Sequence, residues 1–70
     1  MDRPLDWTDV EDIAYALFEA EPERDPLTLR FTELIDKVLA LPNFQGDRER
    51  CNEKILEAVQ MAWLEEFQDA

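Results

Sequence analysis

CNEKILEAVQMAWLEE, residues 51–66, is the stretch that decides the fold of this chain. Its apolar side chains recur every three or four positions, which is the spacing of one face of an α-helix. They are Cys51, Ile55, Leu56, Ala58, Val59, Ala62, Trp63 and, just beyond the stretch, Phe67. The pattern predicts an amphipathic helix that follows a cap at Asp47 and runs to about Glu66, with Met61 and Leu64 outside its apolar stripe.

A second amphipathic segment lies near the start of the chain. Thr8 is a good N-cap, and Glu11 three residues later completes a capping box. The helix that they open is predicted to run to about Ala20 and to stop before Pro22. One half of its surface is apolar and the other half is acidic, so it should also pack on one side only.

The middle of the chain carries the remaining helical signals. Asp25 can cap a short turn that has Pro26 at its first helical position. Thr32 is the predicted N-cap of a further helix, which Pro42 ends. The sequence therefore predicts an all-α, mainly helical, three-helix fold. Residues 1–70 form one domain, in which residues 7–67 are the ordered core and the ends are frayed.

Charge limits what this chain can approach. Its 70 residues hold 18 acids and 7 bases, which gives a formal net charge of −11. A field this negative repels phosphate backbones and anionic lipids, and it attracts cations and basic protein surfaces. Nucleic acid and membrane are therefore excluded as expected partners, even though two helices joined by a tight loop resemble a helix-turn-helix.

Catalytic apparatus is not visible in the sequence. One cysteine and no histidine exclude an internal disulfide and a Cys/His zinc site, and they leave no base to activate the thiol. Cys51 lies on an apolar stripe and is predicted to be a buried structural thiol. The chain is expected to be no enzyme, and to be a cytoplasmic monomer without a leader or a membrane-spanning segment.

Carboxylates are the remaining chemistry. Asp9 and Asp12 lie close enough on one helix face to approach a single ion together, whereas Glu19 is two turns further on. Such oxygen ligands bind hard cations weakly and with poor selectivity, so they suit labile ferrous iron and equally magnesium or calcium. The alternative is a solvated acidic face with no bound ion.

Two tryptophans and two off-stripe apolar residues complete the set of candidates. Trp63 is predicted to pack in the core, and Trp7 to fold back against the first helical turn as a hydrophobic staple. Met61 and Leu64 are candidates for contact with a partner, although single exposed apolar residues are common on protein surfaces.

The chain resembles the IscX family, small acidic accessory proteins of bacterial iron–sulfur cluster assembly. The resemblance runs from about Trp7 to Glu66 without an evident gap. It rests most specifically on residues 52–58, Asn-Glu-Lys-Ile-Leu-Glu-Ala, followed by Trp63-Leu64. It also rests on Trp7-Thr8-Asp9, Ala16-Leu17, Asp25-Pro26, Thr28, Arg30-Phe31-Thr32 and Phe44.

This resemblance implies a modified winged-helix-like fold and binding to the cysteine desulfurase, with other cluster-assembly proteins as further partners. It implies weak binding of ferrous iron, no tightly bound cofactor and no catalysis. The loop after the second helix has fewer acids than the family pattern, so the metal site is placed on Asp9, Asp12, Asp25 and Glu33. The residues assigned to partner binding are Glu19, Glu53, Glu57, Met61 and Leu64.

Two hypotheses follow for function. The first is an iron-carrying adaptor that docks on the desulfurase. The second is an electrostatic regulator that competes with frataxin for the desulfurase surface and for which iron is incidental. A nucleic-acid mimic is a third possibility, which no motif supports.

Overall fold

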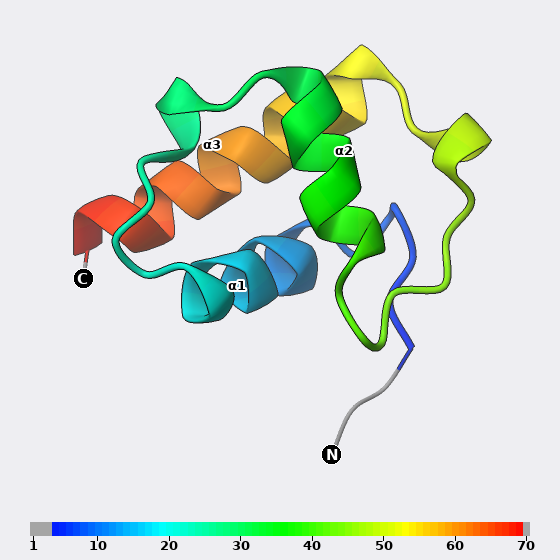
Figure 1. The fold of residues 1–70 in the computed structure, drawn as a ribbon, viewed down its shortest axis with the longest axis horizontal. Coiled ribbons are helices and arrows are strands. Elements are labelled where there is room, and N and C mark those ends of the chain that lie inside the picture. The colour runs from blue at the N-terminus through cyan, green and yellow to red at the C-terminus, as the bar shows by residue number, and fades with distance from the viewer. Residues whose placement is uncertain (1–3, 70) are drawn as a thin grey trace.

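The computed structural model describes residues 4–69, in which three α-helices and two short 3₁₀ helices follow one another (Figure 1). They are α1 (Val10–Ala20), η1 (Pro26–Thr28), α2 (Phe31–Leu39), η2 (Arg48–Arg50) and α3 (Glu53–Asp69). Within this part of the chain, β pairing is limited to one isolated bridge between Leu5 and Phe44. The predicted all-α, three-helix fold is confirmed. The fraying predicted for the chain ends falls partly on residues 1–3 and 70, outside the described range.

No helix in the described range is both long and apolar enough to cross a membrane.

α1 and α3 lie side by side and run in the same direction, and α2 crosses near their amino-terminal ends (Figure 1). Contact between α1 and α3 is the most extensive of any pair of elements. η1 also packs against α3, on the side of α3 that faces away from α1 (Figure 1). There the side-chain amide of Gln60 donates a hydrogen bond to the Pro26 carbonyl at 3.0 Å. The result is a flat molecule of 29 × 28 × 16 Å.

The core draws on all three helices. Ile13 of α1, Leu34 and Val38 of α2, and Val59 and Trp63 of α3 are completely inaccessible to solvent. Trp63 therefore has the packing role that its position in the sequence predicts. Its buried indole N–H finds no acceptor among residues 4–69, a cost of roughly 1–3 kcal/mol that its large apolar area must offset. Trp63 thus contributes mainly buried apolar volume at the centre of the fold.

The start of α1 differs from the predicted capping box. Asp9, not Thr8, is the N-cap residue, and it makes no side-chain capping hydrogen bond within α1. The backbone first turns between Asp6 and Asp9, where the Asp9 N–H donates to the Asp6 carbonyl at 2.9 Å. This turn places Thr8 outside the helix, which is why a capping signal read from local sequence is one residue off.

The other two helix starts are also shifted. α2 begins at Phe31, before the predicted cap Thr32, because the Glu33 carboxylate accepts the Arg30 N–H at 3.1 Å. Asp47 precedes η2 instead of α3, and Asn52 caps α3 by accepting the Ile55 N–H at 2.9 Å. α3 consequently begins later than predicted and extends to Asp69.

Two smaller predictions have different outcomes. Asp25 does cap η1, since its carboxylate accepts the Leu27 N–H at 2.9 Å. Cys51 was expected on the buried stripe of a helix. It lies just before α3 and is only partly buried against the core, because the helix starts after it.

The segment before α1 is fastened to the loop that follows α2. Leu5 donates its backbone N–H to the Asn43 carbonyl at 2.9 Å and accepts the Gln45 N–H at 2.8 Å. Trp7 is buried beside it, with its ring edge-to-face against Phe44 at a centroid distance of 4.8 Å. Its indole N–H donates to the Asp47 carbonyl at 2.6 Å. Trp7 therefore joins two segments that are distant in sequence.

Gly46 lies where this fastening leaves no room for a side chain. A Cβ atom there would stand 2.7 Å from the Asp6 Oδ1 atom, 2.7 Å from the Phe44 ring and 2.9 Å from the Trp7 ring. Each of these distances is shorter than van der Waals contact, so a larger residue would force the two rings apart.

We expect Gly46→Ala to lower the free energy of unfolding by about 1–3 kcal/mol, the usual cost of inserting atoms into a packed site. Urea denaturation followed by tryptophan fluorescence measures this. Gln45→Ala is the matched control, because Gln45 is exposed and its backbone hydrogen bond survives the change. Equal stability of the two variants would contradict the packing described here.

Candidate functional site

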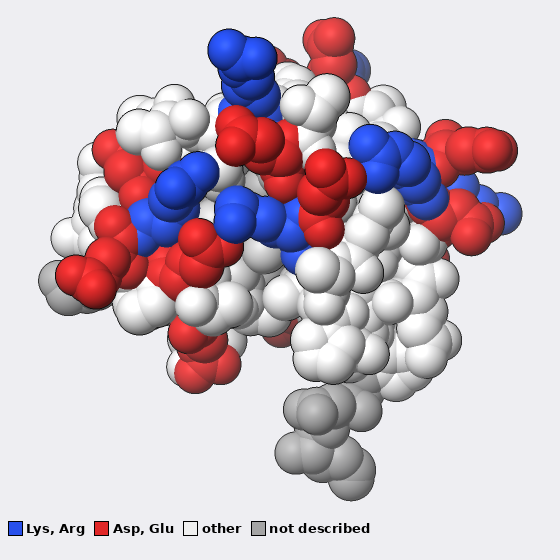
Figure 2. Space-filling view, in the orientation of Figure 1, with Lys and Arg blue, Asp and Glu red and all other residues white. Residues whose placement is uncertain are grey.

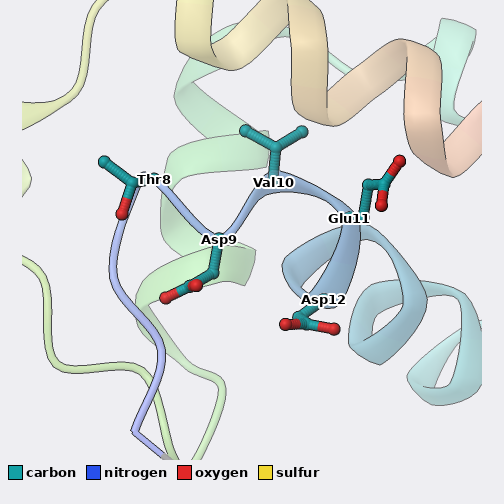
Figure 3. Close-up of a pocket in the computed structure, with 5 residues that line it drawn as sticks. All are labelled: Thr8, Asp9, Val10, Glu11 and Asp12. Carbon is teal, nitrogen blue, oxygen red and sulfur yellow. The ribbon is translucent and has the colours of Figure 1, made fainter.

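A shallow pocket of ≈330 Å³ opens at the start of α1 (Figure 3). Its lining residues are Thr8, Asp9, Val10, Glu11 and Asp12. Asp9 and Asp12 project to one side of the chain, whereas Val10 and Glu11 project to the other (Figure 3). The Asp9 carboxylate also accepts the Asp6 N–H at 2.9 Å, which holds its side chain in place. The fold therefore brings together the two aspartates that helical spacing had paired.

The other two predicted metal ligands lie elsewhere. Asp25 precedes η1, and its carboxylate already accepts the Leu27 N–H. Glu33 is in the first turn of α2, where it accepts the Arg30 N–H and lies 4.0 Å from the Arg24 guanidinium. Neither residue lines the pocket at the start of α1. Both carboxylates stabilise helix starts in this structure.

Within residues 4–69, no three His, Cys, Asp or Glu side chains are grouped so that they could hold a metal ion together. The pocket offers the two carboxylates of Asp9 and Asp12. Oxygen ligands of this kind suit a hard divalent cation that keeps most of its water molecules. Chemically, this arrangement fits an ion that is picked up and released, and not a permanent metal centre.

Charge is distributed unevenly over the fold. α1 and α3 together carry eight acids and a single base, Lys54. The acids are Glu11, Asp12, Glu19, Glu53, Glu57, Glu65, Glu66 and Asp69. Since α1 and α3 pack against each other, we treat the exposed side of this pair, on which every charged residue but Lys54 is acidic, as one unit and call it the α1–α3 acidic surface.

Acids and bases alternate on the side of the molecule that carries α2 (Figure 2). Lys37 of α2 pairs with Glu21 at 2.5 Å, and Asp36 of α2 pairs with Arg48 at 2.9 Å. Glu33 of α2 faces Arg24 as described above. Each pair joins α2 to a neighbouring loop or turn. Exposed pairs of this kind add little stability, but they cancel the charge of α2 locally.

The residues predicted to bind a partner fall on the α1–α3 acidic surface. Glu19 is exposed on α1, and Glu53 and Glu57 are exposed on α3. Met61 continues the stripe of Glu53 and Glu57 with an exposed fraction of 52%, and Leu64 is half-buried. The structure thus brings these side chains from two helices onto one pair of packed elements.

Sequence reasoning gave no role to Tyr15, an exposed residue of this surface. Tyr15 lies on α1 with half of its surface accessible. The negative charge of Glu19 raises the pKa of the Tyr15 phenol above its usual value, helped by hydrogen bonding to Glu19 and, to a lesser extent, by Glu66. The signal in the sequence was an aromatic residue on the acidic half of a helix.

Comparison with known proteins identifies the family. A family model described as iron-sulphur cluster assembly matches residues 5–68. The chain belongs to this family. Its model spans all three helices and corresponds to the IscX family, so the resemblance found in the sequence is confirmed. The chain is also 50% identical over 62 residues to an uncharacterized protein of Pseudomonas aeruginosa, an alignment that covers 89% of this chain and 94% of the relative.

Tyr15 is the chain's single tyrosine, so absorbance at alkaline pH reports its ionisation alone. We expect the pKa of the Tyr15 phenol to lie above the ordinary tyrosine value of about 10. Glu19→Gln should lower the pKa, because it removes the carboxylate that disfavours the phenolate. Glu23→Gln, which changes the same charge in the loop before η1, is the control and should leave the pKa nearly unchanged.

The same shift has a consequence for stability. Because the pKa of Tyr15 is higher in the folded than in the unfolded state, the protonated phenol stabilises the fold. This contribution is complete at pH values below the unfolded pKa of about 10. This contribution disappears as the pH rises through the folded pKa. In Glu19→Gln the free energy of unfolding should therefore fall less between neutral and alkaline pH than in the unmodified protein. An unchanged Tyr15 titration curve in this variant would contradict the Tyr15–Glu19 interaction.

Proposed function

We propose that this member of the iron–sulphur cluster assembly family is an accessory protein that docks on the cysteine desulfurase through the α1–α3 acidic surface. Ferrous iron is its weakly bound cargo, held near Asp9 and Asp12. The observation that carries the proposal is the segregation of charge, with eight acids and one base on the packed pair α1 and α3. The protein would act in the cytoplasm as a monomer, without catalysis of its own.

Electrostatic complementarity explains why this surface suits a basic enzyme face. Carboxylates concentrated on one side of a small protein steer a positive partner into a defined orientation and accelerate their encounter. The α2 side lacks this property because Glu21–Lys37 and Asp36–Arg48 neutralise each other there. The distribution of charge therefore supports one preferred docking side.

Labile iron is compatible with the same site. Asp9 and Asp12 offer hard oxygen ligands next to the docking surface, and the chain has no histidine to bind the ion more tightly. An ion held by two carboxylates exchanges readily and can pass to a stronger site on the partner. Protonation of the carboxylates would release it.

The alternative function is a purely electrostatic regulator that occupies a basic site on the desulfurase, shared with frataxin, while iron is incidental. One observation favours it: residues 4–69 contain no group of three potential metal ligands. Both functions use the same surface, so they differ only in whether iron changes the interaction.

We expect binding to the desulfurase to weaken steeply with added salt, because the screening length falls from about 10 Å at 0.1 M to about 3 Å at 1 M. Isothermal titration calorimetry over this range measures the effect. The double variant Glu53→Gln, Glu57→Gln should weaken binding and flatten the salt dependence. Both residues are exposed on α3, so the helix should stay folded.

The control is the double variant Glu23→Gln, Asp36→Asn, which removes the same charge away from the α1–α3 acidic surface. It should bind nearly as well as the unmodified protein. If both double variants lose the same affinity, only net charge matters and no docking side exists. Binding that is indifferent to salt would indicate an apolar contact through Met61 and Leu64 instead.

For iron, we expect ferrous ion to broaden the NMR signals of residues 8–12 selectively and reversibly. Asp9→Asn combined with Asp12→Asn should abolish this broadening, because it removes both carboxylate charges. Cys51→Ser is the control, since its thiol lies before α3, and it should leave the broadening unchanged. Broadening centred on Cys51, or none below millimolar iron, would leave the electrostatic regulator as the function.

A further inference from the structure

Tyr15 lies on the α1–α3 acidic surface, where its ring is not needed to fill the hydrophobic core. Half of its surface is exposed, so the ring contributes little to the core. Residues four apart on a helix are neighbours on its surface, which puts Glu11 one turn before Tyr15 and Glu19 one turn after it. Both glutamates are themselves exposed. An aromatic ring therefore stands between two carboxylates along α1.

α3 adds a third carboxylate beside the ring. Glu66 is near enough for its charge to act on the Tyr15 phenol across the contact between α1 and α3. A tyrosine phenol is protonated at neutral pH, so Tyr15 presents a neutral hydroxyl group and an electron-rich ring face beside these carboxylates. Carboxylates from two helices thus lie near one accessible aromatic ring.

Leu27 and Met61 show what is particular to this position. They are exposed to a similar extent, 57% and 52% respectively. Leu27 follows the capped start of η1, and its aliphatic side chain offers no π face. Isolated exposed apolar residues need no functional explanation. Tyr15 differs because its ring and its charged neighbours together match one chemical group, a side-chain cation.

We propose that Tyr15 is the anchor point of the α1–α3 acidic surface, where the ring receives an arginine side chain of the basic partner while Glu11, Glu19 and Glu66 surround the guanidinium. This inference rests on the proposed function and deepens it, by naming the partner group that the surface recognises.

Charge and geometry favour arginine in this place. A guanidinium is planar, so it can stack on the phenol ring and at the same time donate hydrogen bonds to carboxylates beside the ring. A lysine ammonium would make the charge contact without the stacking. A second copy of this chain is a poor occupant, because each copy carries a formal net charge of −11 and would bring carboxylates against carboxylates.

The test uses the full chain and the desulfurase at a single moderate salt concentration. Tyr15→Ala should weaken binding about tenfold, within the range of a largely desolvated cation–π contact. Tyr15→Phe should stay within about threefold of the unmodified chain, because it keeps the ring. Leu27→Ala is the matched control and should bind as the unmodified protein does. Alanine favours the helix at position 15, and circular dichroism confirms that each variant is folded.

A second measurement observes the ring directly. Because the chain has one tyrosine, labelling with 3-fluorotyrosine gives a single ¹⁹F NMR signal from position 15. This signal should shift or broaden as desulfurase is added, and replacement of arginines on the partner's basic face should restore it.

The possible failures are distinguishable. If the unmodified chain shows no binding to the desulfurase, the proposed function fails and this inference fails with it. If the chain binds but Tyr15→Ala binds equally well and the ¹⁹F signal does not move at saturation, the docking proposal stands and the anchor role of Tyr15 is overturned. Equal losses for Tyr15→Ala and Leu27→Ala would also overturn it.

Discussion

The packing of α3 against α1 around Trp63 is the contact on which the rest of the structure depends. Leu56, Val59 and Trp63 present a narrow apolar face, and Ile13 and Leu17 of α1 belong to the same buried core. Hydrophobic burial is indifferent to the charge on the far sides of the helices, so it can hold two acidic helices next to each other. The same contact therefore closes the core and concentrates the negative charge of the protein.

Concentrating like charges has an energetic cost that a small domain must accommodate. Mutual repulsion among the carboxylates of α1 and α3 opposes folding, although solvent and salt screen it. On the other side, ion pairs from α2 to neighbouring loops remove charge without adding much stability. The two sides of the molecule therefore differ in their balance of acids and bases.

The metal binding and the docking that we propose have compatible structural requirements. Asp9 caps α1 and Asp12 lies in its first turn, whereas Tyr15 and Glu19 lie further along the same helix. Neither function needs a deep cavity or a buried polar network, both of which a chain of 70 residues has little core to support. Both proposals call only on exposed carboxylates and one accessible aromatic ring.

The sequence by itself determined the number of helices, their apolar faces, the acidic half of α1 and the pairing of Asp9 with Asp12. These features depend on spacing within one helix, and helical periodicity is a local property. Only the tertiary structure decided the features that join distant segments. Trp7 bonds to the Asp47 carbonyl, Gly46 is confined between two rings, and Glu66 acts on Tyr15. The positions at which the helices begin belong partly to this second group. A turn at Asp6 and a cap at Asn52 make α1 and α3 begin at other residues than those that local capping preferences predict. No spacing rule reports which helix a side chain will face, since that choice follows from how the apolar faces fit together.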